Sequence, residues 1–221
     1  MIEMNEKALS LDPDLIEAQF GIGMVYFFQK RFAEAKRSFE MVIRIKSDFY
    51  PAYFWLGSMS YMLGDYEAAI NCFEVCADIK PYSEEPWEWL RMTYQIKGDL
   101  KKAQEAEDKV VELGERKLEV NPNDGMTLSR LAQTYARKGE NKKALNAINR
   151  VVEIDPNDGW ALYNCSCTYA LLGKKEEAFT LLEAALETGV MHVIEFVKGD
   201  PGFESIRDDP KFQEILSKYS I

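Results

Sequence analysis

The sequence predicts an all-α fold, an α-solenoid of antiparallel helix hairpins that ends in a C-terminal capping helix. Three observations predict it. Residues of one type recur along the chain in several series, here called columns, and the columns share one period. That period is 34 residues, and the apolar residues between the columns recur at helical spacing. Successive members of each column are 34 residues apart except across one interval of 41, which indicates an insertion of 41 − 34 = 7 residues. The columns are Ala35, Ala69, Ala103, Ala144 and Ala178; Pro13, Ser47, Pro81, Pro122 and Pro156; and Gly64, Gly98, Gly139 and Gly173.

Each column holds a residue type that a helix hairpin needs at that point. Glycine is expected where the first helix ends in a left-handed conformation, which a β-carbon would penalise. Proline is expected just after the second helix, because it cannot continue the hydrogen-bond ladder. Alanine is expected where the two helices cross too closely for a larger side chain.

The apolar residues between the columns predict the two helices of each hairpin. In the first helix they recur at helical spacing, as in Trp87, Leu90 and Tyr94. In the second helix Ala69 lies one turn before Phe73, and the same spacing recurs in the other units. Two apolar stripes that face each other predict a hairpin.

The full pattern resembles the tetratricopeptide repeat, whose spacing is Trp-x2-Leu-Gly-x2-Tyr, then Ala-x3-Phe, then Pro. The best matching positions are Tyr53, Leu56, Gly57, Ala69, Phe73 and Pro81. The resemblance implies a tetratricopeptide superhelix. Residues 1–13 would be the second helix of an incomplete N-terminal unit, and residues 190–221 would be a capping segment. Residues 14–189 would form five units (16–49, 50–83, 84–124, 125–158 and 159–189), one of them with a seven-residue helix extension near 104–121.

Several positions depart from the repeat pattern, and the unit from Glu84 is the most irregular. Arg91 replaces the small glycine of the first helix, and Glu107 replaces the phenylalanine of the second. Elsewhere Gln19 and Ser60 replace large residues. The seven extra residues are close to two helical turns, so we expect the stack to continue past a second helix that protrudes by about 10 Å.

The two ends carry different expectations. Residues 3–11 resemble a second helix without a first, and such an uncovered apolar face suggests a longer parent protein, pairing with another copy, or a short terminus that frays. At the other end Asp209 is a plausible N-cap with Pro210 at the first helical position. This tail resembles the closing segment of tetratricopeptide arrays behind bacterial or archaeal signalling domains.

Composition narrows the choice of partner. The formal net charge is −10 and the sequence pI is about 4.8, which argues against nucleic acid and favours a neutral or basic protein partner. We expect no membrane-spanning segment, since there is no long uncharged apolar run. The cysteines form two close pairs without the spacing of a disulfide framework, which indicates reduced thiols in the cytoplasm. They are Cys72, Cys76, Cys165 and Cys167.

The sequence predicts no enzyme activity, no cofactor and no metal site. The single histidine, His192, has no cysteine or carboxylate at ligand spacing, so a packed or surface histidine is the simpler interpretation. Nowhere do a nucleophile, a base and an orienting group stand together at a recognisable spacing. The lysine and glutamate clusters that begin the second helices are typical of solvated surface.

The first helices should line the inner, concave face of the solenoid, and their residues outside the core stripes should form a peptide-binding groove. An exposed apolar patch of this kind usually marks an interface, although the rings could instead pack against a neighbouring helix. The predicted groove residues are Phe20, Met24, Phe27, Phe54, Ser58, Tyr61, Glu88, Met92, Gln95, Trp160 and Tyr163.

Two functional hypotheses follow. The first is a non-catalytic scaffold that binds a partly apolar peptide or an amphipathic helix of a partner protein in this groove. Tetratricopeptide domains that capture acidic chaperone tails resemble one another in carrying a clamp of lysine and asparagine. The equivalent positions here hold Phe20, Met24, Phe54 and Ser58, which disfavours such a ligand. The second hypothesis is a self-assembly module, a dimer or filament through the uncapped N-terminal half-repeat, or a regulatory region of a larger signalling protein.

Overall fold

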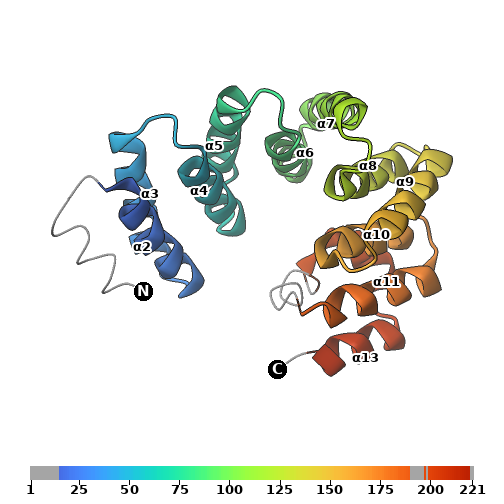
Figure 1. The fold of residues 1–221 in the computed structure, drawn as a ribbon. Helices are drawn as coiled ribbons and strands as arrows, with labels where there is room; N and C mark the ends of the chain where they lie inside the picture. Colours follow the sequence, from blue (N-terminus) through green and yellow to red (C-terminus); the bar gives the residue numbers. More distant parts are fainter. Residues whose placement is uncertain (1–14, 190–196, 198, 220–221) are drawn as a thin grey trace. The chain divides into compact units, whose positions relative to one another are not determined.

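The computed structural model describes residues 15–189, 197 and 199–219, and within them it contains helices and no strands. The helices are arranged as antiparallel neighbours in adjacent packed pairs, which confirms the predicted all-α hairpin array (Figure 1). The chain divides into two compact units, with the boundary between Lys109 and Val110. The expected N-terminal half-repeat at 1–13 and His192 lie outside the described residues.

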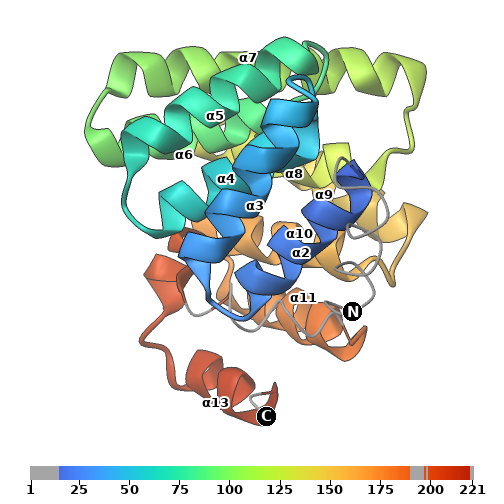
Figure 2. The ribbon, with the colours of Figure 1, turned by 90° about the vertical axis from the view of Figure 1, so that its left-hand side faces the viewer.

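The first unit holds two complete hairpins and most of a third. The α2–α3 hairpin packs through α3 on α4, and the α4–α5 hairpin packs through α5 on α6. Figure 2 brings α2 and α3 to the front. The helices are α2 (Ile16–Phe28), α3 (Phe32–Ile45), α4 (Tyr50–Met62), α5 (Tyr66–Ile79), α6 (Glu85–Lys97) and the first half of α7 (Leu100–Val120).

The turns inside the hairpins have the left-handed geometry that the glycine column predicts. Gly64 has φ +79° after α4, and the next backbone amide, that of Asp65, donates to the carbonyl of Ser60 at 2.9 Å. Asp65 then caps α5 by accepting from the amide of Ala68 at 3.2 Å. The equivalent position after α2 is Lys30, a non-glycine residue with φ 59°. The hairpin geometry therefore holds even where the side chain strains it.

The core of each hairpin lies where the two helices cross. Ala35 and Ala69 have no exposed surface. A β-carbon added at Gly23 would lie 2.6 Å from the ring of Phe39, and one added at Gly57 would lie 2.9 Å from that of Phe73. The small residue of the first helix therefore makes room for the phenylalanine of the second.

In the third hairpin, α6–α7, charged residues occupy the two positions that hold glycine and phenylalanine in the first two hairpins. Arg91 is 8% exposed and Glu107 is 9% exposed. The Arg91 guanidinium pairs with Glu88 at 3.0 Å and donates to Gln95 Oε1 at 2.8 Å. Burial lowers the pKa of Arg91, but the charges of Glu88 and Glu107 outweigh it, so this pKa lies above its ordinary value. The two sequence departures in this hairpin thus interact electrostatically.

Helix α7 contains 21 residues, seven more than the 14 residues of α3 or α5. Ala103 and Ala106 belong to the core of the first unit, whereas Val111 and Leu118 pack against the core of the second. Helix α7 therefore contributes residues to the cores of both units.

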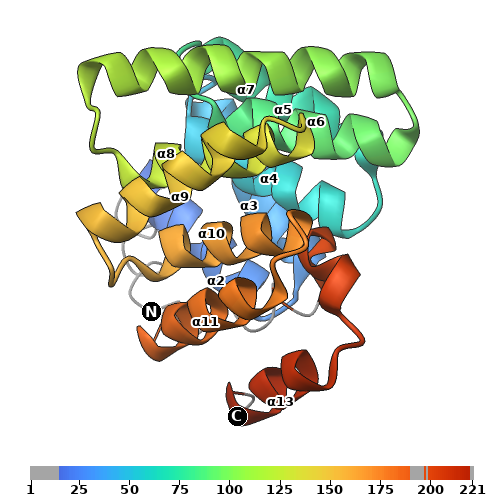
Figure 3. The same cartoon turned by 90° about the vertical axis from the view of Figure 1, so that its right-hand side faces the viewer.

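The second unit holds two hairpins followed by a C-terminal segment. Helix α8 packs on α9 and α10, α10 packs on α11, a 3₁₀ helix (η1) packs on α10, and α13 packs on α11, as Figure 3 shows for the last helices. The elements are the second half of α7, α8 (Gly125–Arg137), α9 (Asn141–Ile154), α10 (Gly159–Leu171), α11 (Lys175–Glu187), η1 (Pro201–Ile206) and α13 (Pro210–Tyr219).

The C-terminal segment is held by an apolar contact and by ion pairs. Phe203 and Phe212 are fully buried in one cluster with Phe179. The pairs Lys211–Glu176 (2.7 Å) and Lys218–Glu183 (3.3 Å) join α13 to α11. As predicted, α13 begins at Pro210, and the Asp209 carboxylate accepts from the amide of Lys211 at 3.1 Å.

Candidate protein-binding surface

The predicted groove residues lie on first helices, but their exposure varies from one to the next. Those on α2 and α4 are half-buried except Ser58, which is buried. On α6, Glu88 and Met92 are half-buried and Gln95 is exposed. On α10, Trp160 is 37% exposed and Tyr163 is 4% exposed. Part of the predicted set is therefore accessible.

Two of the predicted rings rest directly on the core. The Phe20 ring lies 5.7 Å from that of core residue Phe39, and the Phe54 ring lies 6.1 Å from that of Phe73, measured between ring centroids. Both rings also pack against the buried clusters of their hairpins. Each ring is therefore partly structural, which corrects the expectation that neither belongs to the core.

Two tryptophans that the sequence reasoning left out of the groove join the aromatic surface. Trp55 on α4 lies 5.0 Å from Phe27 on α2, and Trp89 on α6 lies 5.5 Å from Tyr61 on α4. Each tryptophan therefore packs on a ring of the preceding first helix. The signal in the sequence was their spacing, since 89 − 55 is the 34-residue period.

The prediction that Ser58 lines the groove is wrong, because this residue is buried. It is 5% exposed, and its hydroxyl donates to the carbonyl of Phe54, one turn earlier, at 2.9 Å. A serine hydroxyl bonded to its own helix has no donor left for a ligand. Ser58 therefore contributes small size here and no hydrogen-bond donor for a ligand.

The N-terminal end of α6 gives the first unit an acidic edge. The Tyr50 hydroxyl donates to the Glu85 carboxylate at 2.9 Å, and the Lys80 ammonium lies 3.8 Å from the centre of the Tyr50 ring. Glu88 is held by Arg91. Carboxylates at the start of a helix also interact favourably with its dipole. This edge adjoins the half-buried Met92 on the same helix.

In the second unit the C-terminal segment covers Tyr163, one of the two predicted groove residues on α10. The Tyr163 hydroxyl donates to the Asp200 carboxylate, and the Tyr163 ring lies 5.7 Å from that of Phe203. Burial, followed by the charges of Cys167 and Asp200, raises the pKa of Tyr163 above its ordinary range. Tyr163 is thus an internal contact, because residues more than 30 positions later occupy its face, which corrects its placement in an open groove.

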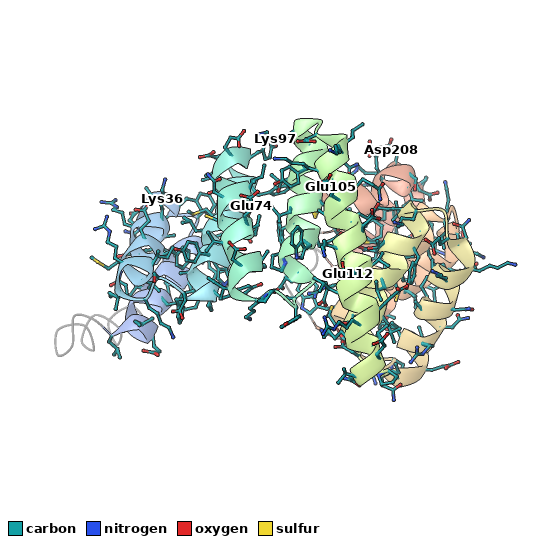
Figure 4. All side chains as sticks on the ribbon, turned by 90° about the horizontal axis from the view of Figure 1, so that it is seen from above. Lys36, Glu74, Lys97, Glu105, Glu112 and Asp208 are labelled. Carbon is teal, nitrogen blue, oxygen red and sulfur yellow. The ribbon has the colours of Figure 1, made fainter. Side chains whose placement is uncertain are left out.

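Charged side chains are numerous on the second helices of the hairpins. Figure 4 labels Lys36 on α3, Glu74 on α5 and Glu105 on α7 within the first unit. Lys36 and Glu40 approach to 4.0 Å along α3, and Lys97 pairs with Glu67 between α6 and α5. Exposed pairs of this kind contribute about 0–1 kcal/mol each, so the outer surface is mainly a solvated face.

The side chains of the described residues can be compared with the requirements of a metal site. No group of three or more histidine, cysteine, aspartate or glutamate side chains there could hold a metal ion. The four cysteines are free thiols, and burial raises the pKa of Cys76 and of Cys165 to about 12. None of the described helices is long and apolar enough to cross a membrane.

Comparison with known proteins agrees with this architecture. A family model described as "Tetratricopeptide repeat" matches residues 50–83 and 127–158, and a second model with the same description matches residues 17–45. No curated protein matches the chain. The chain is a tetratricopeptide-repeat protein.

Several solved structures share this fold. TTC0263, a thermophilic tetratricopeptide-repeat protein of Thermus thermophilus, is 16% identical with a TM-score of 0.62, covering 92% of this chain and 96% of its own. Yeast Tom70 is 20% identical with a TM-score of 0.59, covering 98% of this chain and 46% of its own. YrrB is 20% identical with a TM-score of 0.51, covering 87% of this chain and 96% of its own, and is described as "a TPR protein with an unusual peptide-binding site". Identities this low show the fold alone.

Proposed function

We propose that this chain is a non-catalytic, cytoplasmic scaffold that binds a peptide or helix of a partner protein along the first helices of its first unit. The observation that carries the proposal is the half-buried aromatic surface formed by Phe27, Phe54, Tyr61, Trp55 and Trp89. Aromatic side chains that are rigid and partly exposed contribute a large share of the energy at interfaces. The tetratricopeptide fold as a class supports a protein-binding role, and YrrB, a structure of this fold, is described as having a peptide-binding site.

The chemistry of the partner follows from the charge around this surface. Glu85 and Glu88 border the aromatic residues on α6, and the whole chain carries a formal net charge of −10. Charge complementarity favours a neutral or basic partner with an apolar face. Met24 and Met92 add side chains that adapt to irregular apolar surfaces. An amphipathic helix with basic flanks fits these conditions.

The C-terminal segment fits a second structural role, that of a cap. Phe212, Ile215 and Leu216 of α13 are buried, whereas Lys211, Gln213 and Glu214 are exposed. A repeat array needs such a terminal element, with an apolar inner face and a polar outer face. We propose that η1 and α13 close the array after α11.

A selection experiment tests the binding proposal. Peptides of about 15 residues would be selected from a random library on the full chain, and their dissociation constants measured by fluorescence anisotropy. Met92→Lys introduces a positive charge beside the aromatic surface, so we expect binding at least tenfold weaker, about 1.4 kcal/mol. Met41→Lys is the matched control, because Met41 is 46% exposed on the outer helix α3. Equal effects of the two variants, with unchanged circular dichroism, would place the site elsewhere.

A further inference from the structure

A tyrosine of the first helix is tied to the second helix of the preceding hairpin by a repeated hydrogen bond. The Tyr94 hydroxyl donates to Glu74 Oε1 at 2.9 Å, and the Tyr135 hydroxyl donates to Glu115 Oε1 at 2.7 Å. The partners are the same distance apart in sequence, since 94 − 74 = 20 and 135 − 115 = 20. Each carboxylate also contributes to raising the pKa of its tyrosine, after burial as the larger cause.

The next tyrosine in this column, Tyr169 on α10, lacks that partner. The position 20 residues earlier is Asn149 on α9, where the other hairpins have glutamate. Within the part of the chain that the structure describes, no hydrogen bond from the Tyr169 hydroxyl is found. Its pKa is raised by burial first and then by the charge of Glu177, with no hydrogen bond among the causes.

A cavity that is open to solvent is present beside Tyr169, with Asn149 and Glu153 exposed and Tyr169 half-buried. It has a volume of about 490 Å³ and is lined by residues of α9, α10 and α11, all within the second unit. The residues that matter here are Asn149, Val152, Glu153, Tyr169, Glu177 and Leu181. The cavity thus lies between the second helices of two successive hairpins, with Tyr169 from the first helix α10 as part of its lining.

The polar lining is rich in acceptors. Glu153 supplies a carboxylate for which no ion pair is found among the described residues, whereas Glu177 is already paired with Lys174 at 2.8 Å. Asn149 supplies an amide oxygen and Tyr169 a hydroxyl oxygen. A ligand with several donors and a positive charge would satisfy all three groups at once.

The apolar lining sets the shape of that ligand. Val152 and Leu181 line the same cavity, and apolar side chains of this kind suit the aliphatic part of a long cationic side chain. A guanidinium is planar, carries five N–H donors and stacks on aromatic rings, whereas an ammonium is a compact and strongly hydrated charge. The combination of a carboxylate, two neutral acceptors and a tyrosine ring therefore fits arginine better than lysine.

We propose that the cavity between α9 and α11 is a second binding site, which takes an arginine side chain of a partner protein. The carboxylate of Glu153 receives the guanidinium, Asn149 and Tyr169 accept from its remaining N–H groups, and Val152 and Leu181 cover its methylene chain. The site is separate from the aromatic surface of the first unit and does not depend on peptide binding there.

A titration of the full chain followed by ¹H–¹⁵N NMR tests this site. The probes are acetyl-Gly-Arg-Gly-amide, the same peptide with citrulline, which keeps the shape of arginine but has no charge, and the same peptide with lysine. We expect the arginine peptide to shift the amide signals of Asn149, Glu153 and Leu181 in a saturable way. The citrulline peptide should bind at least fivefold more weakly, and the lysine peptide should bind more weakly than the arginine peptide.

Two variants locate the effect. Glu153→Gln removes the proposed charge partner and should weaken arginine binding at least fivefold. Glu183→Gln removes the same charge from α11 outside the cavity and should leave binding unchanged. The proposal is overturned if arginine and citrulline bind equally, if lysine binds as well as arginine, or if both variants weaken binding alike. Loss of peptide binding in the first unit would change none of these results.

Discussion

Arg91 and Glu107 interact across the α6–α7 hairpin at the two positions that hold Gly57 and Phe73 in the α4–α5 hairpin. In α4–α5 the glycine leaves room for the phenylalanine ring. In α6–α7 a buried arginine and a buried glutamate stand at these two positions, and the charge of the glutamate raises the pKa of the arginine. Two changes that would each damage a hairpin alone are therefore compatible together.

This relationship predicts a compensating pair of substitutions. Arg91→Gly should lower the free energy of unfolding by about 3 kcal/mol, because it leaves Glu107 and Glu88 without their cation in a buried site. The double variant Arg91→Gly with Glu107→Phe should recover most of that loss, since it restores the contact seen in the neighbouring hairpin. Urea unfolding of the wild type, both single variants and the double variant measures the coupling. Additive losses would show that the two side chains act independently.

The left-handed turn at Lys30 predicts a stabilising substitution. Lys30 has φ 59° where the equivalent turns have Gly64 and Gly98. A left-handed conformation costs a residue with a β-carbon about 1 kcal/mol relative to glycine, so Lys30→Gly should raise the free energy of unfolding by about 0.5–1 kcal/mol. Thermal unfolding followed by circular dichroism measures this gain. The reverse change, Gly64→Lys, should destabilise by a similar amount, and a stabilising Gly64→Lys would contradict the turn argument.

The alanine column predicts intolerance to larger residues. Ala69 is 0% exposed at the crossing of α4 and α5. Ala69→Leu should cost about 1–3 kcal/mol, because the added methylenes force the two helices apart. Ala33→Leu, on the exposed surface of α3, is the matched control and should change the thermal midpoint little. Because contacts in a repeat array are local, hydrogen exchange should increase most in the α4–α5 hairpin. Uniform exchange along the whole chain would count against this packing.

The broken tyrosine contact predicts a gain from restoring it. Asn149→Glu should supply Tyr169 with the carboxylate that Tyr94 and Tyr135 have, and so stabilise the second unit by about 1 kcal/mol. The gain should disappear in the Tyr169→Phe background, which lacks the hydroxyl. Tyr135→Phe should itself destabilise, since it leaves Glu115 without this donor. A gain that persists without the Tyr169 hydroxyl would assign the effect to surface charge.

The sequence predicted the helices and their core because a repeated hairpin must solve the same packing problem in every unit. The left-handed conformation at Gly64 and the buried Ala69 follow from spacing alone. The exposure of individual groove residues did not follow, because it depends on which neighbour covers them. Tyr163 is buried by Phe203 and Asp200, which lie outside the repeat period. Periodicity cannot predict a contact made by a segment that does not repeat.

The aromatic surface was predicted only in part for a related reason. The sequence pattern identifies Phe27 and Tyr61 as non-core residues of a first helix, but it does not predict that Trp55 and Trp89 lie beside them. A helical stripe defines which residues share a face of one helix. It does not define how the adjacent helix is rotated, and that rotation decides which tryptophan meets which ring.

The charged pair in the α6–α7 hairpin also restricts how the chain can misassemble. Hairpins that are similar in sequence can exchange partners, within one chain or between copies, because the wrong helix buries its apolar stripe almost as well as the right one. Arg91 against Phe73 would bury a cation without the carboxylate of Glu107, and Gly57 against Glu107 would bury an anion without its cation. Each mispairing costs several kcal/mol, whereas the native pairing costs little. The least regular hairpin thus distinguishes the correct order of the helices from its alternatives.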